Sequence, residues 1–184
     1  MAAAPLALPR PAAGDHDPAA AAYLACAPAI TDAVGQLAAQ RDAAVRRLSQ
    51  IKPDQAGYRY APDKWTVREV IGHLADAERV FTYRLLRIGR GDATPLAGFD
   101  ENTYVPAGRF ERRPLDAVVE DWAAVRESTL ALVKGMPADA WTRRGTANGK
   151  SVTASALVYI LYGHVEHHLT LLHERYGVGG SAAR

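Results

Sequence analysis

The sequence predicts an all-α fold, a four-helix bundle with a long irregular connection between its second and third helices. Three observations lead to this prediction. Four long segments place apolar residues three and four positions apart, the spacing that lines one face of an α-helix. Segments rich in glycine and proline separate them. There is no internal repeat and no alternating strand pattern of useful length, and a chain of 184 residues fits one domain.

The first two helices are expected at about residues 30–51 and 67–88. Thr66, followed three residues later by Glu69, is typical of a capping box at the start of the second. Glycine or proline residues follow the last apolar position of each helix and indicate where it ends.

The other two helices are expected in the second half of the chain. The third begins near Pro114, because proline suits the first position of a helix, and it ends at Gly135. The last begins near Ser151 or Thr153 and ends at Gly177.

Three connecting segments complete the pattern. Residues 92–113 hold two prolines and two glycines. An irregular segment of this length is uncommon in a compact domain and is often functional or mobile. Residues 137–141 are expected to form a short turn of helical character, and residues 144–150 a turn or a short hairpin.

The two ends of the chain are expected to lie outside the bundle. Residues 1–22 are rich in alanine and proline and carry little charge. No continuous apolar run follows a basic start, so we expect a disordered leader rather than a signal peptide. The bundle is expected at residues 23–178 and a flexible tail at 179–184.

Composition limits the partners. The formal net charge is +2, and basic and acidic residues are intermixed along the chain. This balance gives no reason to expect nucleic acid or an anionic membrane as a partner. Cys26 is the only cysteine and cannot form an internal disulfide, so the expected compartment is a reducing cytoplasm.

Three histidines are the candidate metal ligands: His73 on the second helix, and His164 and His168 on the last. Residues four apart project from one helix face, one turn apart. All three fall among apolar positions and should point into the bundle, where an unpartnered imidazole is costly. Three imidazole nitrogens with a fourth position open are typical of a catalytic zinc-type site. A single cysteine excludes a cysteine-rich structural zinc site.

Alternatives to this interpretation remain. Each histidine could be a core residue held by a hydrogen bond, which would leave a helical scaffold that binds nothing. His167 could also reach inward, although we expect it at the edge. Asp76, one turn from His73, and Asp100 in the long connection are the candidate catalytic residues. Asp76 could instead be a fourth ligand, and Asp100 could be a solvated loop residue.

Three motifs carry a resemblance to a known family. Residues 64–79 read KWTVREVIGHLADAER, residues 94–102 read TPLAGFDEN, and residues 163–168 read GHVEHH. In this order and spacing they resemble the DinB-like superfamily, the metal-binding four-helix bundles of DinB/YfiT type. The resemblance covers residues 28–176.

The resemblance implies a bundle that holds a divalent metal, most often zinc or nickel, through three histidines, here His73, His164 and His168. Family members include S-transferases that use low-molecular-weight thiols and proteins described as metal-dependent hydrolases. The family name refers to induction by DNA damage and does not imply a polymerase.

Our hypothesis is therefore a metal-dependent enzyme, a thiol S-transferase or a hydrolase, that acts on a small-molecule substrate. Coordination would lower the pKa of a thiol or a water in the open position. The alternative is a non-catalytic metal-binding protein of the stress response. Either could form a homodimer. Arg109, Arg112 and Arg113 could attract the carboxylates of an anionic thiol or, as we expect, form a solvated basic patch.

Overall fold

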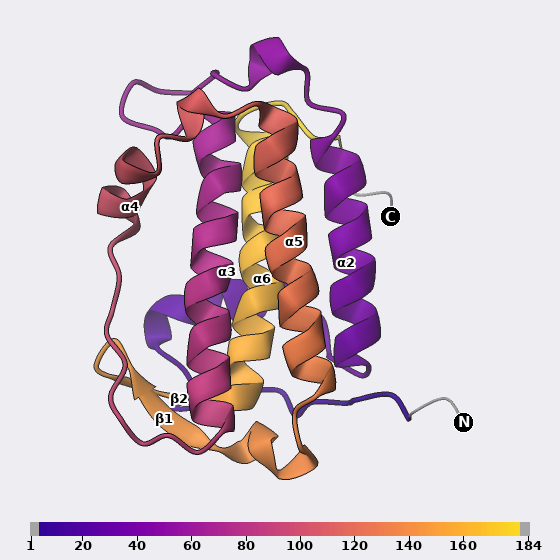
Figure 1. Ribbon diagram of the computed structural model, residues 1–184, viewed down its shortest axis with the longest axis vertical. Helices are drawn as coiled ribbons and strands as arrows, with labels where there is room; N and C mark the ends of the chain where they lie inside the picture. Colours follow the sequence, from indigo (N-terminus) through magenta and orange to yellow (C-terminus); the bar gives the residue numbers. More distant parts are fainter. Residues whose placement is uncertain (1–3, 181–184) are drawn as a thin grey trace.

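The computed structural model describes residues 4–180 and has four long helices that run side by side (Figure 1). These are α2 (Ala33–Leu48), α3 (Val67–Gly89), α5 (Leu115–Lys134) and α6 (Ala154–Glu174). Helices α2 and α3 each pack against both α5 and α6. The predicted all-α four-helix bundle is confirmed. In residues 4–180, no helix combines the length and the hydropathy needed to cross a membrane.

Shorter elements precede these helices, connect them or pack beside them. They are α1 (Ala21–Cys26), α4 (Glu101–Gly108) and the antiparallel hairpin β1 (Arg144–Ala147) and β2 (Lys150–Thr153). Single 3-10 turns lie at Pro18–Ala20, Pro53–Gln55, Phe110–Arg112 and Ala138–Thr142. Leu96 forms an isolated parallel bridge with Ala147, so the connection after α3 lies against the hairpin.

The connection at residues 92–113, which we expected to be irregular, contains helix α4. Asp100 caps this helix by accepting a hydrogen bond from the Asn102 N–H. Pro106 lies in its second half, and only one hydrogen-bond donor is missing there. The local cap therefore outweighs the helix-breaking residues that favoured a loop.

The expected disorder of the leader is wrong for residues 4–22. Leu8 is 5% exposed and lies in the core, and its backbone N–H donates to Ile30. The Tyr159 hydroxyl donates to the Leu8 carbonyl, and the Arg10 guanidinium donates to two backbone carbonyls at the end of α1. Small residues let this extended segment lie close to α6, and its backbone groups find partners there. Of the expected tail at residues 179–184, residues 181–184 lie outside the described part of the chain.

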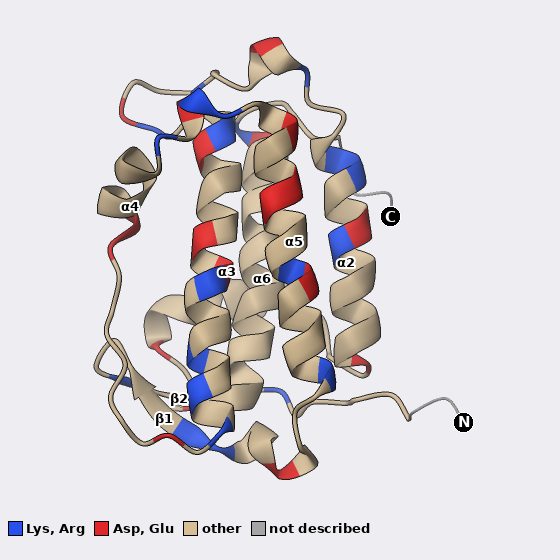
Figure 2. Ribbon diagram, viewed as in Figure 1, with Lys and Arg blue, Asp and Glu red and all other residues tan. Residues whose placement is uncertain are grey.

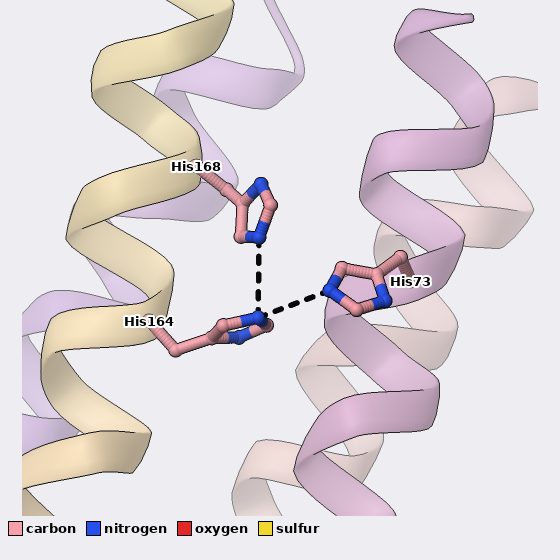
Figure 3. A group of neighbouring side chains, drawn as sticks. All are labelled: His73, His164 and His168. Carbon is pink, nitrogen blue, oxygen red and sulfur yellow. Dashed lines mark hydrogen bonds between the residues drawn. The ribbon is translucent and has the colours of Figure 1, made fainter. Parts of the chain in front are cut away.

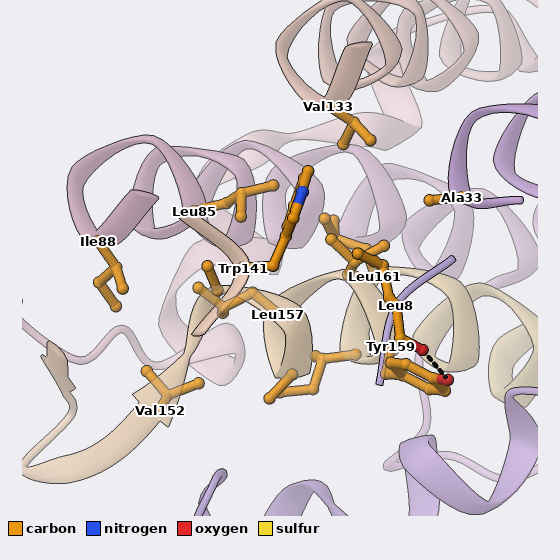
Figure 4. Close-up of a cluster of buried hydrophobic side chains, with 14 of the residues drawn as sticks. Leu8, Ala33, Leu85, Ile88, Val133, Trp141, Val152, Leu157, Tyr159 and Leu161 are labelled. Carbon is orange, nitrogen blue, oxygen red and sulfur yellow. Dashed lines mark hydrogen bonds between the residues drawn. The ribbon is translucent and has the colours of Figure 1, made fainter. Parts of the chain in front are cut away.

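The hydrophobic core consists of two clusters, one toward each end of the bundle. The first packs the start of α6 against the end of α3, the hairpin and the leader, with Leu85, Leu157 and Trp141 near its centre (Figure 4). The second surrounds Leu74 and Trp122 at the other end. On each long helix, the residues of one cluster give way to those of the other near the middle.

A buried polar layer separates the two clusters. Glu78 and Arg126 form an ion pair with side chains 2% and 0% exposed. Trp122 Nε1 donates to Glu78 at 3.0 Å, and the Thr129 hydroxyl donates at 2.9 Å. Arg126 also donates to the Gln40 side chain at 2.7 Å, which brings α2 into the layer. Elsewhere basic and acidic residues are interspersed over the helices rather than gathered on one face of this view (Figure 2).

Gly163 allows α1 to lie directly on α6. A Cβ at this position would come 1.8 Å from the backbone carbonyl oxygen of Tyr23. We expect Gly163→Ala to displace α1 and to lower the free energy of unfolding by about 1–3 kcal/mol, although alanine favours a helix. Urea unfolding measures this, with Gly57→Ala as control because its Cβ would meet nothing within 4 Å. Wild-type stability in Gly163→Ala would contradict the close contact.

Candidate metal centre

The three histidines lie between two adjacent helices, α3 and α6 (Figure 3). The structure confirms the capping box predicted at Thr66 and Glu69, and α3 begins at Val67, the residue after Thr66. The cap fixes where the helix starts and therefore the helical register of His73. His164 and His168 stand one turn apart on α6 and point toward α3. The two predicted helix faces therefore meet at one point.

The imidazoles converge through one nitrogen each. The distance from His164 Nε2 to His73 Nε2 is 3.0 Å, and that to His168 Nε2 is 3.1 Å. One nitrogen from each of the three rings lies within 4.8 Å of the others. The residues are only 5%, 3% and 6% exposed in sequence order. Protein atoms rather than solvent thus hold the three rings in place.

Burial keeps the three histidines neutral at pH 7. It lowers the pKa of His73 to about 4. It lowers the pKa of His164 and of His168 well below 6.5, and the neighbouring imidazoles add to the effect. A neutral imidazole keeps one nitrogen lone pair, which is the form that binds a metal.

The arrangement fits a divalent cation. Hydrogen bonding alone leaves it poorly satisfied, because each neutral ring has one N–H and His164 Nε2 faces two other nitrogens. Tetrahedral zinc with Zn–N bonds of about 2.0–2.1 Å would hold its nitrogens about 3.3 Å apart. The two separations from His164 Nε2, 3.0 Å and 3.1 Å, are only a few tenths of an ångström shorter. One feature differs from the usual metal site. His168 Nδ1 is buried and has no hydrogen-bond partner among the described residues, whereas metal-binding histidines usually donate a hydrogen bond from their second nitrogen.

Aromatic rings surround the cluster. Trp65 lies 4.9 Å from the His73 ring, and Tyr23 and Phe81 lie 5.0 Å and 5.5 Å from the His164 ring, between centroids. These contacts restrict rotation of the imidazoles. His167 packs on Tyr23, is half-buried and does not belong to the converging group, which places it at the edge.

A cavity of about 310 Å³ opens over the histidines. Its other walls come from α1, α3, the segment before α4 and the hairpin turn. The lining side chains other than the histidines are Ala19, Tyr23, Trp65, Phe81, Arg84, Phe99, Glu101 and Asn148. The cluster is therefore reachable by a small molecule from one side.

The structure brings neither expected catalytic carboxylate to this cavity. Asp76 is in an ion pair with Arg79 at 3.5 Å, and burial raises its pKa. Asp100 is exposed and caps α4, as described above. Glu101, one residue later, lines the cavity instead. An N-cap side chain hydrogen-bonds to the first turn of its own helix. The capping pattern is therefore the sequence signal that favours Glu101 over Asp100 as a cavity residue.

Sequence reasoning also missed Arg84. It follows His73 by eleven residues, three turns of α3, so the two share a helix face to within about 20°. Arg84 lines the cavity, whereas Arg109, Arg112 and Arg113 do not. Arg113 pairs with the Asp121 carboxylate at 2.8 Å and Arg112 contacts Glu111 on the surface.

The low histidine pKa values predict acid sensitivity of the metal-free protein. Between pH 6.5 and about 4 the unfolded chain protonates His73 and the folded protein does not. The free energy of unfolding should therefore fall as the pH falls through this window, by about 3 kcal/mol for His73 alone. Urea unfolding at pH 7, 5.5 and 4 measures the slope. His73→Gln should flatten it and the exposed His173→Gln should not; equal slopes in all three proteins would refute the expectation.

Comparisons with known proteins give the following matches. The family model of the DinB superfamily matches residues 7–172. YfiT from Bacillus subtilis, described as a probable metal-dependent hydrolase with an unusual four-helix bundle topology, superposes with a TM-score of 0.66 at 18% identity, over 79% of this chain and 86% of its own. A DinB-like protein from the same organism gives 0.58 at 16% identity, over 83% of this chain and 95% of its own.

A mycothiol-dependent maleylpyruvate isomerase is a third structural relative. Its TM-score is 0.64 at 18% identity, over 82% of this chain and 60% of its own length. At these identities the three structures establish the fold and not the reaction. No curated protein matches this sequence significantly.

Proposed function

Because this chain belongs to the DinB superfamily, we propose that it is a metal-dependent enzyme that transfers a low-molecular-weight thiol to a small electrophilic substrate. The observation that carries the proposal is the convergence of three neutral imidazole nitrogens at the base of an open cavity. The thiol dependence of one structural relative and the metal dependence ascribed to another support it.

The protein would hold the metal through His73, His164 and His168, a donor set that suits zinc and nickel. When bound, the cation supplies Lewis acidity and lowers the pKa of a thiol or a water beside it. Glu101 is a carboxylate in the lining of the cavity and would take up the proton that the thiol loses. Burial and the charge of Glu101 raise the pKa of Tyr23, so its hydroxyl remains a hydrogen-bond donor toward the substrate at pH 7.

The test combines metal content with turnover. Purified protein should carry about one equivalent of zinc or nickel, the stoichiometry of a single three-histidine site. It should also accelerate the reaction of mycothiol or another small thiol with an electrophile such as monochlorobimane. His73→Ala should lose both the metal and the rate, and His173→Ala should keep both. Metal without turnover would favour the non-catalytic metal-binding protein; absence of metal after reconstitution would reduce the histidines to core packing.

Hydrolysis is the second candidate, and the position of Glu101 in the cavity favours it because the same carboxylate can take a proton from water. Hydrolysis of p-nitrophenyl esters in the absence of thiol, lost in Glu101→Gln, would identify this reaction. A rate that requires thiol would reject it.

A further inference from the structure

A second cavity of about 180 Å³ continues from the one over the histidines. The two share the side chains of Ala19, Tyr23, Phe81, Arg84 and Asn148. The far wall of the second cavity is apolar, with Val152 from β2 and Leu157 and Ile160 from α6. The two cavities are therefore adjacent, one over the histidines and one an apolar recess, and are together called the groove.

Arg84 stands where the two cavities meet and is unusually placed for a charged residue. It is 8% exposed, and its guanidinium carbon lies 5.9 Å from the Phe81 ring centroid and 5.8 Å from that of Phe99. Its Nη2 donates to the Ala97 carbonyl at 2.9 Å, but Nε has no partner among the described residues. Within residues 4–180, no carboxylate lies within 4.0 Å of this guanidinium.

A buried charge without a counter-ion is costly, and proteins normally pair it. Among the described residues the other buried arginine is Arg126, which pairs with Glu78 and so obeys this rule. Burial alone lowers the pKa of Arg84, so no opposite charge offsets the loss of hydration. The missing counter-ion therefore points to an anion from outside the chain.

The remaining charges of the groove agree with this. Lys150 lines the recess with Arg84. Asp17 also lines it, but its carboxylate is engaged in capping the N–H of Ala19 at 3.0 Å. Glu101 lines only the cavity over the histidines. The recess thus has two cations against one carboxylate, that of Asp17, and Glu101 adds a second carboxylate at the histidine end.

We propose that Arg84 binds a carboxylate of the substrate and that the apolar part of this substrate lies in the recess. Phe81 contacts both the His164 ring and the Arg84 guanidinium, so a carboxylate held by Arg84 would be separated from the histidines by a single aromatic side chain. The substrate class is that of small apolar or aromatic carboxylic acids. Only the statement that this ligand reacts rests on the proposed function; the binding itself does not.

The experiment measures binding by calorimetry to the metal-free and the zinc-loaded protein. The probes are benzoate, phenylacetate and 3-phenylpropionate, each beside its alcohol. At least one acid should bind wild type more tightly than its alcohol does. Arg84→Met should lower the affinity for that acid by about tenfold or more, which is the contribution of a charge-assisted hydrogen bond, and should leave the affinity for the alcohol unchanged. Arg87→Met is the matched control. Arg87 lies three residues after Arg84 on α3, pairs with Asp92 and lines neither cavity, so this variant should bind the acid as wild type does.

Three results would overturn the proposal: no acid binds wild type, acid and alcohol bind equally, or Arg84→Met binds the acid as wild type does. If Arg84→Met does not fold, Arg84→Lys and the acid–alcohol difference in wild type decide the question. Acid binding that persists in a protein without metal or turnover would sink the proposed function alone. Metal and turnover with no role for Arg84 would sink this inference alone.

Discussion

His164→Ala should lose tight metal binding, whereas His167→Ala should retain it. His164 Nε2 is the central donor of the cluster, at 3.0 Å and 3.1 Å from the other two ligand nitrogens. His167 has its ring toward Tyr23 and lies outside the group. Substitution of a residue that hydrogen-bonds to a metal ligand typically lowers the metal affinity about 10- to 100-fold. Removal of the central ligand itself should therefore lower the metal affinity by more than about 100-fold.

Competition with a chromophoric zinc chelator measures this difference, and elemental analysis gives the stoichiometry. Both variants remove an imidazole from adjacent turns of α6, so each controls for the general effect of the change. Equal loss of metal in the two variants would overturn the ligand assignment. Full retention in His164→Ala would mean that the metal binds elsewhere or that the histidines are core residues.

Glu78→Ala should lower the free energy of unfolding by about 3–5 kcal/mol. The variant leaves the Arg126 guanidinium without its counter-ion at 0% side-chain exposure. It also removes the acceptor for Trp122 and Thr129, which both donate to this carboxylate. Urea unfolding of the metal-free protein at pH 7 measures the loss without a contribution from metal binding.

The matched control is Glu127→Ala on α5. Glu127 also pairs with an arginine, Arg41, but its side chain is 67% exposed, and surface pairs contribute about 0–1 kcal/mol. A double variant, Glu78→Leu with Arg126→Met, should recover much of the loss because no unpaired charge is left. Similar losses in Glu78→Ala and Glu127→Ala would show that burial of the pair is not what makes it matter.

The long helices were predictable because their signals are local. The apolar spacing, the Thr66–Glu69 capping box and the glycines and prolines at the ends are all read within a few residues. The observed helices lie inside the expected bounds, except that α3 continues one residue further, to Gly89. The i, i+4 spacing of His164 and His168 likewise fixes their common face. Which face of α3 meets which face of α6 followed from apolar position alone.

What sequence reasoning missed depends on contacts between distant segments. The leader is held by hydrogen bonds to backbone carbonyls, such as that from Tyr159 to Leu8 across 151 residues, and composition carries no trace of them. Glu101 enters the cavity because Asp100 is committed to a cap, which required knowing that a helix begins there. The burial of Arg84 could not be predicted because it depends on Phe99, a residue of the connection after α3 that packs on the Arg84 guanidinium.

The two parts of the site have partly separate origins in the chain. The ligand imidazoles come from α3 and α6, which also supply part of the groove wall, whereas most of the rest of the wall comes from residues 17–23, the segment around Phe99 and the hairpin turn. Leu96 and Ala147 join the last two segments, and a side chain at Gly98 would run into Asn148. Insertions, deletions or single exchanges in these connections would resize the groove without altering the helical register of the ligands. The shape of the groove can therefore change among descendants of such a protein while the three histidines keep their positions.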